Sequence, residues 1–145
     1  MTFLPDVNVW IALIAAEHPH SSVAQQFVSE QPAATLALCR VTQMSILRLL
    51  TNPHVMGLDV KKAGQAWEIW DRLLAAPNVA FANEPYGIED KWRSMVPEEQ
   101  KGPNFWTDAY LAAFAQVTGY TLVTFNRGFS KYRKIPLRIL SAKVH

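Results

Sequence analysis

Short apolar segments alternate along this chain with longer segments whose apolar residues recur at helical spacing. The short segments have the length and composition of strands, at residues 2–5, 34–38, 78–82, 120–125 and 137–140. The segments between them favour helices over residues 9–16, 21–29, 41–50, 60–74, 87–95 and 105–118. Strands that alternate with helices build parallel sheets with helices on both faces. We therefore expect an α/β fold: a three-layer α/β/α sandwich around a mostly parallel sheet of four or five strands, with residues 1–145 forming a single domain.

Local signals predict how these elements begin and pack. Asn8 can cap the helix over residues 9–16, because its side-chain oxygen can accept a backbone N–H that has no partner in the first turn. Trp67 and Trp70 lie three residues apart on one apolar stripe, so we assign both to packing. Residues 96–103 contain two prolines and a glycine among polar residues, and we expect them to form a loop.

The composition bounds the class of protein. The chain has 145 residues, of which 50% are hydrophobic, enough for a core that needs no disulfide. Cys39 is the only cysteine, which fits a reducing compartment. The longest apolar run, residues 9–16, is far shorter than the roughly 20 residues that span a bilayer, and no signal-peptide pattern stands at the N-terminus. We therefore expect a cytoplasmic protein with no membrane partner.

Charge is distributed unevenly along the chain. Residues 109–145 contain six Lys or Arg and no Asp or Glu, whereas the whole chain has a net charge of only +2. Residues 1–108 therefore carry a net charge of −4. This asymmetry allows an anionic partner to bind the C-terminal part, although a solvated surface of mixed sign would show the same pattern.

Three polar residues stand where the expected strands end. Asp6 follows the first strand, Asn126 follows the strand at 120–125, and Asp108 lies in the first turn of the helix at 105–118. Sites in open α/β sheets lie outside the carboxyl ends of the strands, so we expect these residues to converge. Each also has a structural explanation, since Asp6 and Asn126 can stabilise turns and Asp108 can complement a helix dipole.

Two carboxylates and nearby amide oxygens suit a hard divalent cation. Mg²⁺ and Mn²⁺ prefer oxygen ligands and retain waters, one of which can become a nucleophile near neutral pH. The chain lacks the glycine-rich loops of dinucleotide and phosphate sites, and its histidines do not have zinc-site spacing.

Several sequence blocks resemble one family. The opening, residues 6–10, resembles that of PIN-domain ribonucleases. Four ordered blocks resemble VapC-type toxins of bacterial VapBC toxin–antitoxin pairs: Arg40-Val41-Thr42-Gln43, Arg48-Leu49-Leu50-Thr51-Asn52, Trp106-Thr107-Asp108-Ala109-Tyr110-Leu111-Ala112-Ala113 and Thr124-Phe125-Asn126-Arg127-Gly128-Phe129. The resemblance implies a PIN-like fold and a metal-dependent endoribonuclease that cuts cellular RNA, is neutralised by a VapB-type antitoxin and forms a homodimer.

The resemblance also implies roles for particular residues. Asp6 and Asp108 match positions that ligate Mg²⁺ or Mn²⁺, and Asn8 and Thr124 match residues that line the site. Candidate RNA contacts are basic residues of the motifs and of the C-terminal segment: Arg48, Arg127, Lys131 and Arg133.

The chain departs from the family pattern at two positions. The family has an acid near Gln43, with Ser45 as a second alignment, and often has Asp where Asn126 stands. We expect Gln43 and Asn126 to act as catalytic residues that position the waters of a cation held by Asp6 and Asp108.

Two alternatives stay open at this point. The substitutions at Gln43 and Asn126 are compatible with a weakened domain that binds RNA or an antitoxin without cleaving. A strand that ends in Asp-x-Asn is also found in aspartyl-nucleophile phosphatases, but Val9-Trp10 stands where those enzymes have Ser or Thr, and no matching lysine follows.

Overall fold

A parallel sheet forms the middle of the molecule. The computed structural model describes residues 1–99 and 102–141. Its strands stand in the order β3-β2-β1-β4-β5, and every pair of neighbours is parallel. The strands are β1 (Phe3–Pro5), β2 (Leu36–Leu38), β3 (Val79–Phe81), β4 (Thr121–Thr124) and β5 (Leu137–Ile139). The expected parallel α/β sheet is confirmed, with the last strand at an edge.

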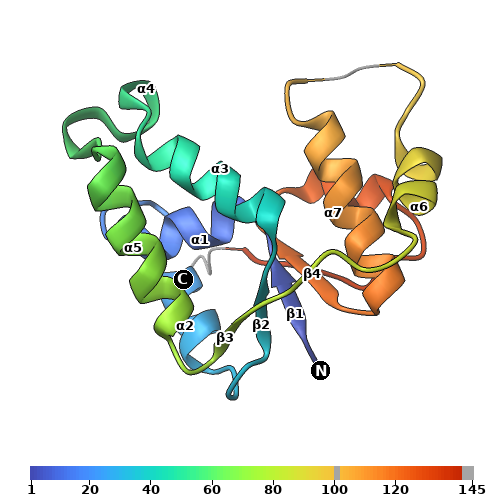
Figure 1. Cartoon of the computed structure of the whole chain (residues 1–145), viewed down its shortest axis with the longest axis horizontal. Coiled ribbons are helices and arrows are strands. Elements are labelled where there is room, and N and C mark those ends of the chain that lie inside the picture. The colour runs from blue at the N-terminus through green and yellow to red at the C-terminus, as the bar shows by residue number, and fades with distance from the viewer. Residues whose placement is uncertain (100–101, 142–145) are drawn as a thin grey trace.

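Helices cover both faces of this sheet (Figure 1). One face carries α1 (Val7–Ile14), α2 (Ser21–Ser29), α3 (Arg40–Leu50), α4 (Pro53–Met56) and α5 (Ala63–Ala75), and the other carries α6 (Ile88–Met95) and α7 (Phe105–Thr118). Two short 3₁₀ helices complete the chain, η1 (Gly57–Asp59) and η2 (Arg127–Lys131). The three-layer arrangement matches the expectation from the sequence.

The strand side chains divide between two cores, one on each face. Phe3, Leu36 and Leu38 pack with α1, α2, α3 and α5, whereas Leu4 and Ala37 pack with α7. Successive strand residues point to opposite faces of the sheet, so one strand contributes side chains to both cores. No helix within the described residues is long and apolar enough to cross a membrane.

Two local expectations were wrong. The N-cap of α1 is Asp6 and not Asn8: the helix begins at Val7, and the Asp6 carboxylate accepts the Val7 N–H at 2.7 Å. Trp70 is buried, but Trp67 is 51% exposed. The stripe of α5 that packs on the sheet is narrower than the apolar pattern indicates, and Trp67 lies beyond its edge.

Candidate active site

The chain order of the strands reverses direction next to β1. From β1 the chain builds β2 and β3 on one side, and β4 and β5 are then added on the other. Such a switch point leaves a crevice at the carboxyl ends of the two strands that flank it. A cleft of about 180 Å³ lies there, lined by residues from the ends of β1 and β4, from the starts of α1 and α7, and from one face of α3: Asp6, Asn8, Thr42, Ser45, Arg48, Asn104, Thr107, Asp108 and Asn126.

Asp6 is held rigidly at the bottom of this cleft. Its side chain is 5% exposed. One carboxylate oxygen accepts the Val7 N–H, and the other accepts the Thr124 hydroxyl at 3.0 Å. Burial raises the pKa of Asp6, while the hydrogen bonds from Thr124 and Val7 oppose that rise. The carboxylate is therefore aimed by groups that only donate to it.

Thr124 joins the two strand ends. Besides donating to Asp6, its hydroxyl oxygen accepts the Asn8 side-chain N–H at 3.2 Å and the Asn126 backbone N–H at 3.0 Å. The Asn8 carbonyl oxygen in turn accepts the Phe125 N–H at 3.3 Å. A hydroxyl has one proton and two lone pairs, so every hydrogen-bonding position of Thr124 is used. The resulting network ties the end of β1 to the end of β4.

Asp108 faces Asp6 across the cleft from the first turn of α7. Partial burial, together with the negative charge of Asp6, raises the pKa of Asp108 to about 6. Lys131 of η2 is close enough to oppose this rise. Tyr132 lies nearby: burial and the charge of Asp108 raise the pKa of its phenol to about 12.

Among the described residues, no Lys, Arg or His forms an ion pair with either carboxylate. The ion pair found among the described residues joins Arg93 to Glu89 on the surface, away from this cleft. Asp6 is buried and Asp108 is half-buried, and their negative charges repel each other. A cation bound between them would relieve this repulsion and stabilise the folded protein. Mg²⁺ is commonly held by one or two carboxylates while it keeps several waters, so the donor set of this cleft fits it. Within the described residues, no group of three His, Cys, Asp or Glu surrounds a common point.

The structure does not bring Gln43 into the cleft. Gln43 is buried, and its carbonyl oxygen accepts a hydrogen bond from Arg40. Ser45, the second alignment for the family's acid, lines the cleft together with Thr42 and Arg48 of the same helix. Residues 42, 45 and 48 are each three positions apart and share a helix face, from which residue 43 is turned away.

Asn126 combines a site position with a structural one. It lines the cleft, but its side-chain oxygen caps η2 by accepting the Gly128 N–H at 2.9 Å. The turn-stabilising explanation for Asn126 is therefore confirmed. A Cβ at Gly128 would stand 3.0 Å from that oxygen, so only glycine leaves the cap undisturbed.

The basic candidates divide into two groups. Arg48 lines the cleft from α3. Arg127, Lys131 and Arg133 are exposed along and just after η2, outside the lining. The sequence interpretation missed Asn104 and Thr107, which line the cleft beside Asp108. Their position immediately before and within the first turn of the 105–118 helix was the signal that could have identified them.

The fold and the cleft together define a PIN-like α/β domain. The PIN domain family model matches residues 3–135. Over 143 residues, the chain is 36% identical to Ribonuclease VapC41 of Mycobacterium tuberculosis, and the aligned residues make up 95% of this chain and 98% of that protein. The chain therefore belongs to the PIN domain family, and within it to the VapC ribonucleases. This membership leaves the phosphatase alternative without support.

Solved structures share the fold at low sequence identity. The Mycobacterium tuberculosis VapC20 structure, described as a Sarcin-Ricin loop cleaving toxin, superposes with a TM-score of 0.68 at 17% identity, covering 91% of this chain and 95% of that one. A toxin–antitoxin complex from Klebsiella pneumoniae gives a TM-score of 0.62 at 18% identity, covering 94% and 96%.

Proposed function

We propose that this protein is a metal-dependent endoribonuclease toxin that cleaves cellular RNA. The observation that carries the proposal is the convergence of Asp6 and Asp108, from β1 and α7, on one cleft beside the Thr124 hydroxyl. The similarity to Ribonuclease VapC41 and to the RNA-cleaving VapC20 supports the same reaction.

Asp6 and Asp108 would hold the cation. When bound there, Mg²⁺ or Mn²⁺ would supply Lewis-acid chemistry, neutralising phosphate charge and lowering the pKa of a bound water. Thr124 keeps the Asp6 carboxylate aimed into the cleft, and its proton is already donated to that carboxylate. Ser45 and Asn126 offer neutral oxygen atoms at the cleft wall that can orient water.

The substrate would be bound through its phosphates. Arg48 stands at the cleft, and Arg127, Lys131 and Arg133 extend a basic surface from it along η2. Such cations neutralise phosphates without reading base sequence. These side chains would hold one phosphodiester at the cleft, next to the cation site of Asp6 and Asp108.

The partners of this toxin would be a VapB-type antitoxin and a second copy of the chain. The Klebsiella pneumoniae structure of the same fold is a toxin–antitoxin complex, which supports the antitoxin. The homodimer rests on the family resemblance of the sequence blocks.

Cleavage of a mixed RNA pool by antitoxin-free protein tests the proposal. We expect cuts with Mg²⁺ or Mn²⁺, none with EDTA, and loss of cutting in Asp108→Asn. Asp90→Asn, an exposed acid on α6, is the matched control and should cut like the wild type. Cutting that survives EDTA or Asp108→Asn would refute the proposed site.

A binding-only protein is the second candidate, because the described residues that line the cleft include two carboxylates and no third acid. It predicts RNA binding that Mg²⁺ does not change and no cuts in any metal. Ser45→Glu, which adds a carboxylate at the cleft wall, would then be the variant in which to look for cutting.

A further inference from the structure

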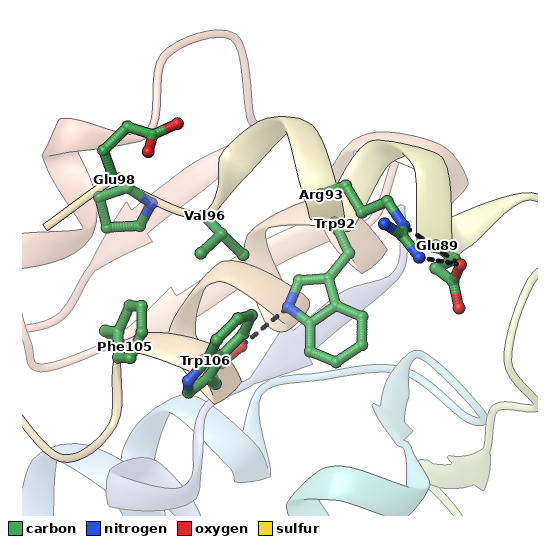
Figure 2. A pocket seen from close by; sticks show the side chains of 8 residues that line it. Glu89, Trp92, Arg93, Val96, Glu98, Phe105 and Trp106 are labelled. Atoms are coloured by element: carbon green, nitrogen blue, oxygen red, sulfur yellow. Dashed lines mark hydrogen bonds and ion pairs between the residues drawn. The ribbon is translucent and has the colours of Figure 1, made fainter. Parts of the chain in front are cut away.

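A second and larger cavity lies between α6 and the start of α7, on the opposite side of α7's first turn from the cleft. Its volume is about 670 Å³, which is within the range of small-molecule sites. Its lining combines aromatic rings from Trp92, Phe105 and Trp106 with the charged side chains of Glu89, Arg93 and Glu98 (Figure 2). We call this cavity the aromatic groove.

The aromatic rings of the groove hold one another in place. The Trp92 indole donates its N–H to the Trp106 carbonyl oxygen at 3.0 Å, and the two rings meet edge to face with centroids 6.1 Å apart. Phe105 is buried against Trp106 at 4.8 Å between centroids. Trp106 itself is 53% exposed. Its ring is thus in contact with two neighbouring rings and still half exposed.

The charges of the groove select the chemistry of that ligand. Glu89 is neutralised by Arg93 at 3.1 Å, whereas Glu98 forms no ion pair with a described residue. A carboxylate only accepts hydrogen bonds and repels phosphate. The ligand must therefore offer an aromatic face and an N–H edge, while its phosphates lie elsewhere.

The groove and the catalytic cleft share one helical turn. Asn104, Thr107 and Asp108 line the cleft, while Phe105 and Trp106 line the groove. A strand of RNA whose phosphate lies at Asp108 can therefore place a neighbouring base over Trp106. Single-stranded RNA is commonly read by bases that are splayed out and stacked on aromatic side chains.

We propose that the aromatic groove is a base-binding subsite for the RNA substrate, in which a nucleobase stacks on Trp106 and donates its edge to Glu98. Guanine fits best, because its N1–H and amino group can donate side by side to one carboxylate; uracil fits worst, because its single N–H is flanked by carbonyl oxygens. This inference rests on the proposed function and assigns the groove a specificity role.

Binding of two fluorescein-labelled short single-stranded RNAs, measured by anisotropy in EDTA, tests the subsite without cleavage. One RNA is oligouridine, and the other carries guanosines within the same length. We expect tighter binding of the guanosine RNA, a loss of about tenfold in Trp106→Ala, and most of that affinity restored in Trp106→Phe. Glu98→Gln should remove the preference for guanosine over uridine. Trp67→Ala, on α5 and similarly exposed at 51%, is the matched control and should bind like the wild type.

The outcomes separate this inference from the proposed function. RNA affinity that Trp106→Ala leaves unchanged would overturn the subsite, even where Asp108→Asn abolishes cleavage and so upholds the function. Loss of affinity in Trp106→Ala and Trp67→Ala alike would also overturn it, because it would point to a general effect of removing exposed indoles. A third outcome would reassign the groove to a protein partner: the wild type binds a basic peptide, Trp106→Ala does not bind it, and both proteins bind RNA equally well.

Discussion

At the scale of single residues, Thr124 determines how the site is held together. Its hydroxyl is fully buried and takes part in three hydrogen bonds, with Asp6, Asn8 and the Asn126 backbone. Thr124→Val keeps the shape and removes all three, which leaves buried polar groups without partners. We expect the free energy of unfolding to fall by about 2 kcal/mol and cleavage to be lost. Urea unfolding measures the first effect.

Thr124→Ser is the control for that prediction, because it retains the hydroxyl and loses only a methyl group. It should keep cleavage and lose less stability than Thr124→Val. Equal stability of the valine variant and the wild type would mean that the network does not stabilise the ends of β1 and β4.

Asp108 links the site to pH. Its pKa is about 6 in the folded protein and near 4 in an unfolded chain, so the folded state binds the proton more tightly. The wild type should therefore lose stability as pH rises from about 4 to about 6. Asp108→Asn does not titrate, and we expect its melting temperature to exceed that of the wild type by about 3 °C at pH 7.5, with no such gain at pH 4.5.

Thermal melts at the two pH values, with and without Mg²⁺, measure this effect. Mg²⁺ should raise the melting temperature of the wild type at pH 7.5 and leave Asp108→Asn unchanged, because the cation relieves the same repulsion. A wild type that is as stable as Asp108→Asn at pH 7.5 without metal would contradict the assigned repulsion between Asp6 and Asp108.

At the scale of elements, the rotation of α3 decides which side chain can supplement the two acids. Ser45 faces the cleft, and Gln43 is buried next to Arg40. Ser45→Glu should therefore raise Mg²⁺ affinity about tenfold, since added ligand charge tightens cation sites. Gln43→Glu, the same charge two residues away, should leave Mg²⁺ affinity unchanged. Calorimetric titration of both variants checks this, and an equal gain in both would place residue 43 at the site.

The elements also show what the sequence can and cannot predict. The order of strands and helices can be predicted from the spacing of apolar residues, because that spacing is a local property. The rule that sites lie at the carboxyl ends of parallel strands predicted that Asp6 and Asn126 lie at one edge of the sheet, and both line the cleft there. The choice between Gln43 and Ser45 depends on how α3 rotates against the sheet. Both side chains are buried, so their polarity does not distinguish them. That rotation is set by packing with distant segments.

The same reason explains the errors at helix ends and faces. Asn8 and Asp6 are both good N-cap residues, and only the pairing of β1 with β4 determines that the helix begins at Val7. Trp67 lies next to the buried face of α5, and the width of that face depends on which segments α5 contacts. Local patterns predict which element forms, while tertiary contacts decide its exact limits and orientation.

At the scale of the whole molecule, the strand order determines where the basic C-terminal segment lies relative to the cleft. β4 lies beside β1, and the basic C-terminal segment follows β4, so this segment begins next to the candidate active-site cleft. The proposed function therefore predicts that RNA binds on the side of the molecule where Arg127, Lys131 and Arg133 are exposed.

This arrangement predicts how RNA binding responds to salt. Replacing Lys131, Arg133 and Lys134 by alanine removes three exposed cations next to the cleft. If each contacts a phosphate, the slope of log affinity against log salt concentration should become shallower by about 2, because fewer counterions are released from the single strand. The control replaces Lys61, Lys62 and Arg72, the same number of cations around α5, and should leave the slope unchanged. Equal slopes in both triple variants would show that net charge alone attracts the RNA, whereas a change confined to the first variant locates the RNA backbone along η2.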